Sequence, residues 1–186
     1  MIKKILAGAL LATVAISAIA PVASAASGKN IVERTQQINR YTHQFDTLLT
    51  AATCPQFKGA VVDVLLQDGI TVFAPTDRAF RRLGRQLGLG RRGLNPSNVC
   101  DVDKVLDSPG ALLRILAYHV YDRGAVDYRT ALSLRGNAIT MASGDEAKLS
   151  GRWWRLRVDG QRVILPNVRA SNGIIHVTRG VLNPLS

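Results

Sequence analysis

The chain has 186 residues, a length that suits one globular domain with a substantial core. It contains no low-complexity linker and no second copy of the motifs described below, so we expect one module rather than a tandem array. Its 24 Lys and Arg residues against 13 Asp and Glu give a net charge of +11, which favours anionic partners.

Residues 1–25 have the pattern of a secretory signal peptide. Lys3 and Lys4 precede an apolar run from Ile5 to Ala20, and Ala23-Ser24-Ala25 is a small-residue cleavage site. The apolar run is short for a spanning helix, which needs about 20 apolar residues. We therefore expect a mature chain of residues 26–186 without a transmembrane segment, exported to the periplasm, the cell surface or the medium.

The first part of the mature chain is predicted to be mainly helical. Apolar residues recur at helical spacing from Ile31 to Ala52, and Val61–Leu66 is ambiguous between helix and strand. Cys54 and Cys100 are the two cysteines of the chain. Because an exported protein meets an oxidising compartment, we expect a disulfide between them, with two buried free thiols as the alternative.

A strand followed by a helix is predicted around residues 70–87. The apolar and β-branched residues 70–73 favour a strand, which Pro75 must end. Thr76 is then placed to cap a helix, and Asp77 lies in the first turn, where the helix dipole favours a negative charge. The same helix carries three apolar anchors at helical spacing, Phe80, Leu83 and Leu87.

Arginines line one face of this predicted helix. They stand at positions i, i+3, i+4 and i+7, namely Arg78, Arg81, Arg82 and Arg85. Arg91 and Arg92 follow in a glycine-rich stretch. These side chains are candidates for partner binding.

A second helix is predicted to begin at Asp107-Ser108-Pro109, with Ser108 as the cap and Pro109 in the first helical position. An apolar stripe continues to Val120, so that Tyr118 and His119 fall in the last turn. A protonated histidine is electrostatically favoured at a helix C-terminus. A structural function for both residues is favoured over a catalytic one.

Strand patterns dominate after Gly124. They cover residues 137–142, 153–158, 162–165 and 174–181, with Asp159-Gly160 as a hairpin turn. Alternation places Trp153, Arg155 and Arg157 on one exposed face, where tryptophan could stack on a sugar and arginine could pair with acidic groups. The alternative is a solvated basic face without a ligand.

A turn and a strand are predicted at the end of the chain. Asn172-Gly173 is typical of a tight turn with positive φ angles. After it, Ile175 and Val177 should face one side of a strand and His176 the other. Without a second His or Cys nearby in sequence, a structural function for His176 is favoured over metal binding.

Three of these segments together resemble the conserved boxes of the fasciclin-like domain family, in the same order: residues 71–80, 115–120 and 172–182. The resemblance extends from about Gln44 to Pro184. It assigns family-motif positions with structural functions to Thr71, Phe73, Pro75, Thr76, Asp77, Phe80, Tyr118, His119, Asn172, Gly173 and His176. Within that set, it implies that the Tyr-His pair helps to lock the fold.

The order of helices first and strands later indicates an α+β domain. The resemblance implies the fasciclin-like fold, with a compact β-sandwich-like core, N-terminal helices and further helices packed on it. This chain departs from the family pattern at Cys54-Pro55 and at residues 84–100, which look like insertions that a disulfide would pin together.

Motifs of catalysis are scarce. We find no nucleophile elbow and no phosphate-binding loop, and the three histidines lack the spacing of a zinc helix, so no enzyme activity, cofactor or metal is expected. The leading hypothesis is an exported adhesion module for surface or matrix proteins. The alternative is a binder of acidic polysaccharide or anionic lipid through the Arg/Trp face; a hydrolase comes third. Specific nucleic-acid binding is not expected, because no such motif is present.

Overall fold

The computed structural model describes residues 28–152 and 155–184, so the predicted signal peptide and Trp153 lie outside the described residues. Its strands are β1 (Ile70–Pro75), β2 (Val120–Tyr121), β3 (Ala138–Thr140), β4 (Glu146–Arg152), β5 (Arg155–Val158), β6 (Gln161–Ala170) and β7 (Gly173–Thr178). They form a seven-stranded sheet in the order β2-β1-β7-β6-β5-β4-β3. The central pair β1–β7 is parallel and the other neighbouring pairs are antiparallel. The predicted α+β fold is confirmed.

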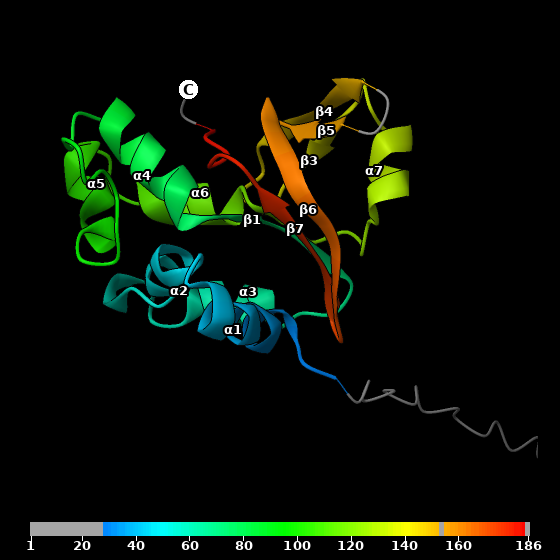
Figure 1. Ribbon diagram of the computed structural model, residues 1–186, viewed down its shortest axis with the longest axis horizontal. Helices are drawn as coiled ribbons and strands as arrows, with labels where there is room; N and C mark the ends of the chain where they lie inside the picture. The colour runs from blue at the N-terminus through cyan, green and yellow to red at the C-terminus, as the bar shows by residue number, and fades with distance from the viewer. Residues whose placement is uncertain (1–27, 153–154, 185–186) are drawn as a thin grey trace, which may run out of the picture.

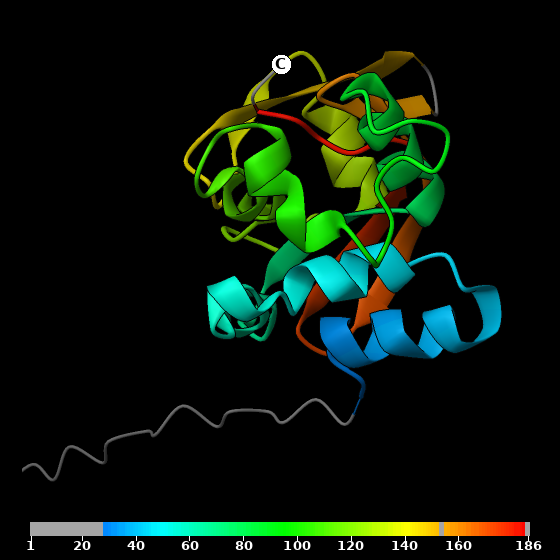
Figure 2. The same ribbon diagram turned by 90° about the vertical axis from the view of Figure 1, so that its left-hand side faces the viewer.

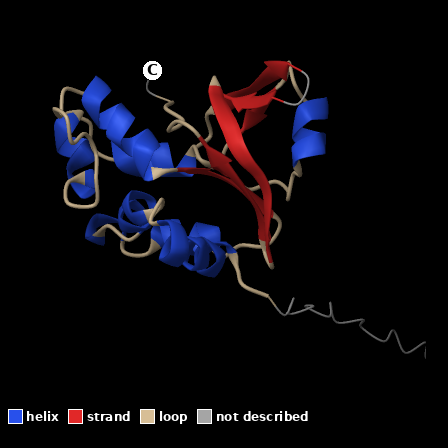
Figure 3. Ribbon diagram, viewed as in Figure 1, coloured by secondary structure: helices blue, strands red, loops and turns tan. Residues whose placement is uncertain are grey.

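Helices cover both sides of this sheet (Figures 1 and 2). They are α1 (Ile31–Thr42), α2 (Asp46–Ala52), α3 (Ala60–Leu65), α4 (Asp77–Gln86), α5 (Val102–Val105), α6 (Ala111–Ala117) and α7 (Tyr128–Ser133), with short 3₁₀ turns η1 (Pro55–Phe57) and η2 (Val99–Asp101). The helices α1–α6 gather on one side and α7 packs on β4 and β5 on the other (Figure 3). Within the described residues, no helix is long and apolar enough to cross a membrane.

The two central strands divide the interior into separate cores. Every residue of β1 and β7 is buried. One face of β1, with Val72 at its centre, packs with Ile31 and Phe45 of the N-terminal segment. Its other face presents Phe73 to a core built from β4, β5 and α7. A third core fills the space between α2, α4 and α6. The predicted strand ending at Pro75 is therefore present and central.

Several predicted boundaries were wrong. Residues 31–52 form two helices, interrupted at His43, whose φ of 48° is left-handed. Residues 61–66 belong to the helix α3 and its C-cap. The helix α7 was not predicted. The strand β4 was not predicted either, because its two buried residues, Ala147 and Leu149, make only a weak alternation.

The predicted start of α6 was also wrong. The helix begins at Ala111, after Gly110, rather than at Pro109. Its free amides are satisfied by Asp103, whose carboxylate accepts from the Gly110 amide at 3.0 Å and from the Leu112 amide at 2.7 Å. Because this acceptor comes from α5 and not from the preceding residue, a local capping pattern could not reveal it.

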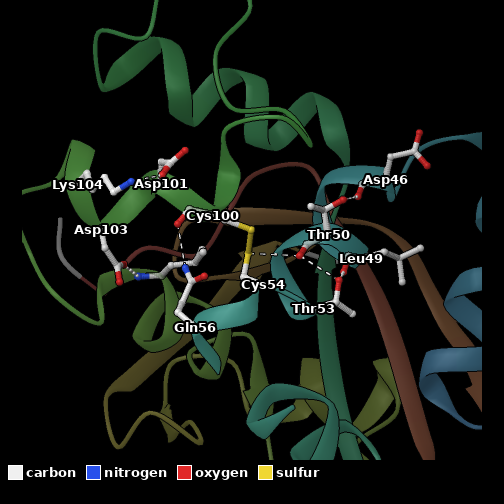
Figure 4. The surroundings of a disulfide bond; sticks show 11 residues. Asp46, Leu49, Thr50, Thr53, Cys54, Gln56, Cys100, Asp101, Asp103 and Lys104 are labelled. Atoms are coloured by element: carbon white, nitrogen blue, oxygen red, sulfur yellow. Dashed lines mark hydrogen bonds and ion pairs between the residues drawn. A yellow bond between two sulfur atoms is a disulfide. The ribbon is translucent and has the colours of Figure 1, made fainter. Parts of the chain in front are cut away.

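The predicted disulfide is present. Cys54, just before η1, is bonded to Cys100 in η2, with the two Cα atoms 5.7 Å apart (Figure 4). The Gln56 side chain adds a hydrogen bond of 2.9 Å to the Cys100 carbonyl. The bridge joins the end of α2 to the end of the long segment that follows α4, so it pins both segments to the helical core.

Two glycines let the inserted segment lie directly against α4. A Cβ on Gly84 would stand 1.9 Å from the Leu94 amide nitrogen, and a Cβ on Gly93 would stand 2.1 Å from the Arg81 carbonyl oxygen. Both obstacles are backbone atoms, which cannot turn aside as a side chain can. The close approach of the segment to the helix therefore depends on these two positions.

We expect Gly84→Ala to lower the free energy of unfolding by about 3 kcal/mol, because the methyl group must push a backbone segment away. The control is Gly90→Ala, which meets no atom within 4 Å and carries only the strain of its φ of +66°, about 1 kcal/mol. Urea unfolding of both variants measures the difference. Equal losses would contradict the proposed backbone contact.

Removal of the disulfide should be costly because it closes a loop of 46 residues. In the chain-entropy model, a loop of this length stabilises the folded state by roughly 4 kcal/mol. We expect Cys54→Ala/Cys100→Ala to lose most of that in urea unfolding, and reduction of the native protein to produce a loss of the same size. A double variant as stable as the native protein would show that the bridge contributes nothing.

Candidate functional site

The family-motif positions lie inside the protein. Of the motif set, only Asp77 is partly exposed, and Thr71 and His176 have no exposed surface at all. Their polar atoms are directed at backbone groups of distant segments. The arrangement is a set of internal hydrogen bonds between segments that are distant in sequence.

His119 joins three segments. Its Nδ1 lies 2.7 Å from the Ile115 carbonyl in α6 and its Nε2 accepts from the Leu182 amide at 2.9 Å, so the ring is neutral with the proton on Nδ1. Its own carbonyl accepts from the Phe73 amide of β1 at 2.8 Å. Burial lowers the pKa of His119 to about 4. The expected benefit of a protonated histidine at the helix end was therefore wrong.

His176 and Thr71 hold residues 124–126, in the segment that follows β2, against the central strands. His176 Nε2 lies 2.9 Å from the Val126 carbonyl, and its ring stacks on Phe73 at a centroid distance of 5.6 Å. Thr71 Oγ1 donates to the Gly124 carbonyl and accepts from the Val126 amide, both at 2.8 Å. Burial also lowers the pKa of His176. Both histidines therefore act as neutral hydrogen-bonding groups.

Asn172 ties the β6–β7 turn to two helices. Its Oδ1 accepts from the Ile31 amide at 2.8 Å, and its Nδ2 donates to the carbonyls of Leu65 and Gln67 at 2.8 and 2.9 Å. The predicted positive φ angles of this turn are absent. Glycine is needed at 173 for another reason: a Cβ there would stand 2.1 Å from the Ile70 carbonyl oxygen of the parallel strand.

Of the remaining polar motif positions, Asp77 and Tyr118 bond to distant segments and Thr76 does not. Thr76 is the N-cap residue of α4, but its side chain makes no capping hydrogen bond. Asp77 instead caps α2, accepting from the Thr47 amide at 2.8 Å. The Tyr118 hydroxyl donates to the Glu146 carbonyl at 2.9 Å. Burial, followed by the nearby charge of Asp159, raises the pKa of Tyr118 to about 12.

Because of these contacts, few polar side chains at the motif positions are available for catalysis. In residues 28–152 and 155–184 no cluster of three or more His, Cys, Asp or Glu side chains could hold a metal ion. The hydrogen-bonding atoms of both buried histidines are engaged with the backbone. The surface is therefore the place to look for a binding site.

One exposed surface is strongly basic. We call it the basic sheet face; it consists of Lys148 and Arg152 on β4, Arg155 and Arg157 on β5, and Arg162 on β6. Across the strands, Arg152 stands opposite Arg155 and Arg157 opposite Arg162. In the described part of the chain none of these five has a carboxylate at ion-pair distance. Of these five residues, only Arg155 and Arg157 were predicted from the sequence, because β4 and the strand register were not predicted.

A second basic surface lies on α4. Arg78, Arg81 and Arg85 are exposed and Arg82 is half-buried, as the helical spacing predicts. These side chains, too, lack a carboxylate partner among the residues described. The inserted segment brings Arg91 and Arg92 close to the same helix, since Gly93 packs on the Arg81 backbone. The basic surface on α4 and the basic sheet face lie on different elements.

We expect the stability of the protein to fall as the pH drops from 6.5 to about 4. In that range the unfolded histidine takes up a proton that the buried His119 ring excludes, which costs about 3 kcal/mol by linkage. His119→Gln should be less stable at neutral pH and show a flatter pH profile over this range. His43→Gln, at an exposed position, is the control and should keep the native slope; an unchanged slope in His119→Gln would contradict the assignment.

The sequence is similar to one family model and to two Synechocystis proteins. The fasciclin domain model matches residues 43–184. The Synechocystis protein sll1735 is 32% identical over 140 residues, which cover 75% of this chain and 89% of the relative. Another Synechocystis protein, sll1483, is 28% identical over 169 residues, which cover 90% of this chain and 81% of the relative.

Two further similarities involve animal proteins. The transforming growth factor-beta-induced protein ig-h3 of Sus scrofa is 30% identical over 125 residues, 67% of this chain but 16% of that protein. A solved FAS1 domain pair from the insect cell adhesion molecule fasciclin I shares the fold, with a TM-score of 0.57 at 14% identity, over 83% of this chain and 50% of that chain. Fasciclin domains are known for cell adhesion, are typically extracellular and are generally non-enzymatic. The chain belongs to the fasciclin domain family.

Proposed function

We propose that the protein is an exported, non-enzymatic adhesion module that attaches to an acidic polysaccharide of the cell surface or matrix through its basic sheet face. Export is supported by the leader pattern of residues 1–25 and by the disulfide, a bond that persists in oxidising compartments. Adhesion is supported by the family. Intact-mass measurement of the exported protein should give a chain that begins at Ala26.

The observation that carries the binding proposal is the pairing of like charges on the sheet. Two arginine pairs stand directly opposite each other on neighbouring antiparallel strands. Like charges in such positions repel and destabilise the sheet. An anionic partner removes this repulsion, so the arrangement favours the bound state over the free one.

The chemistry of the side chains defines the partner. Each guanidinium can donate two parallel hydrogen bonds to a carboxylate or sulfate group, which gives directional as well as electrostatic recognition. A group of such side chains across three strands suits a polymer with repeated anionic groups better than a single small anion. Anionic lipid is the competing partner, and the experiment below distinguishes it from polysaccharide.

The test compares two triple variants that remove the same charge from different surfaces. Arg155→Ala/Arg157→Ala/Arg162→Ala should bind immobilised polyuronate at least about tenfold more weakly than the native protein, equivalent to about 1.4 kcal/mol. Arg81→Ala/Arg82→Ala/Arg85→Ala on α4 should bind as the native protein does. Native binding should weaken from low to physiological salt, because exposed charges are screened.

Three results would contradict the proposal. Equal weakening of both variants would show attraction by net charge alone. Loss confined to the α4 variant would move the binding surface to that helix. Binding to anionic vesicles but not to polyuronate, measured by cosedimentation, would replace the polysaccharide by a lipid surface.

A further inference from the structure

A cleft of about 310 Å³ opens between the three N-terminal helices and the edge of the sheet. Its walls come from α1, α2 and α3, and its floor from β1, β2 and the end of α6. Floor residues such as Val72, Leu116 and Val120 are buried. In Figure 1 these helices lie below β1, away from β4 and β5, so the cleft is separate from the basic sheet face.

Apart from Gln36, which is exposed at the rim, the polar side chains that line the cleft have their hydrogen bonds inside the protein. Thr35, Thr50 and Thr53 each donate to the carbonyl four residues earlier in the chain, at 2.8, 2.8 and 2.9 Å. His119 is engaged at both nitrogens and is neutral. No Asp, Glu, Lys or Arg side chain lines the cleft. Its wall therefore offers a guest almost nothing but carbon.

This surface is a poor site for water and a good one for hydrocarbon. A bound water needs two to four polar partners, and apolar cavities without them stay dry. Protein interiors are close-packed, so an apolar space of this size leaves dispersion contacts unmade along its walls. A chain of methylene groups would make those contacts without leaving any polar group unpaired.

The volume sets the size of the guest. It is about twice that of an apolar cavity of about 150 Å³ that holds one benzene molecule, which indicates a guest of about a dozen carbon atoms. The cleft is open to solvent on one side, where Gln36 and Thr53 are exposed. A polar head group can therefore remain at this rim, in water.

We propose that this cleft binds one alkyl chain of about a dozen carbons, with its head group at the rim beside Gln36 and Thr53. The site takes an amphiphile such as a medium-chain fatty acid or alcohol. Recognition is by shape and apolar contact, so the charge of the head group contributes little. The site is independent of polysaccharide binding on the sheet and does not rest on it.

The test uses the exported protein and the neutral dye N-phenylnaphthylamine, whose fluorescence rises in apolar surroundings. We expect saturable binding of one dye molecule per chain. Laurate and dodecanol should both displace the dye, and butanol should do so far less effectively. Because no charge lines the cleft, the anionic and neutral dodecyl compounds should compete within a few-fold of each other.

Variants locate the binding site. Val62→Trp, on α3, and Thr53→Trp, at the rim, should fill the cleft and lower dye affinity at least about tenfold. The control is Val105→Trp on α5, a partly exposed valine outside the cleft, which should bind dye as the native protein does. Circular dichroism establishes that each variant is folded, and either cleft variant alone is sufficient for the comparison.

The proposal is wrong if the native protein shows no saturable dye binding, or if dodecanol and laurate fail to displace the dye. It is also wrong if a folded Val62→Trp or Thr53→Trp protein keeps the native affinity. Binding that disappears equally in Val105→Trp would likewise overturn it, because the dye would then report a general change in the helices.

Discussion

The parallel pairing of β1 with β7 is the constraint on which the rest of this structure depends. It brings residues 70–75 beside residues 173–178, which are far apart in the chain, and buries both strands completely. A parallel pair requires a long crossover connection, and here that crossover contains every element from α4 to β6. The pair also separates the core under α1–α3 from the core under β4 and β5. The absence of a side chain at Gly173 is part of the same constraint, because the strands start to pair there.

Polar residues stabilise this arrangement from within. A helix leaves unpaired amides at its start and unpaired carbonyls at its end, and in this protein several of these groups are satisfied by side chains from distant segments. Asn172 serves both α1 and the end of α3, Asp77 serves α2, and Asp103 serves α6. His119 and His176 satisfy backbone groups of the C-terminal segment and of a loop in the same way. The polar side chains that most resemble catalytic residues in the sequence are therefore engaged in hydrogen bonds that hold the elements together.

The two proposed binding sites lie on different parts of the molecule, and only the cleft borders the family-motif segments. The basic sheet face uses the outward positions of β4, β5 and β6, and the proposed alkyl-chain cleft uses the helical side of β1. The two sites differ in chemistry: repeated guanidinium groups on the sheet, and carbon with internally satisfied hydroxyls in the cleft. An adhesion module of this form could hold an acidic polymer and an amphiphile at once, because no residue is shared between the two sites.

By itself, the sequence determined those features whose cause is local or chemical. The strands at residues 70–75 and 173–178, the hairpin at Asp159-Gly160, the arginine row on α4 and the Cys54–Cys100 bridge were all correctly predicted. Strand composition, turn chemistry and helical periodicity are readable within short segments, and the chain has only two cysteines to pair. Only the tertiary structure decided what depends on register and on contacts between distant segments. The caps of α2 and α6, the close approach at Gly84, the opposed arginine pairs and the apolar cleft belong to this group. Each arises where two stretches far apart in sequence meet, and local propensity carries no information about which stretches will meet or in what alignment.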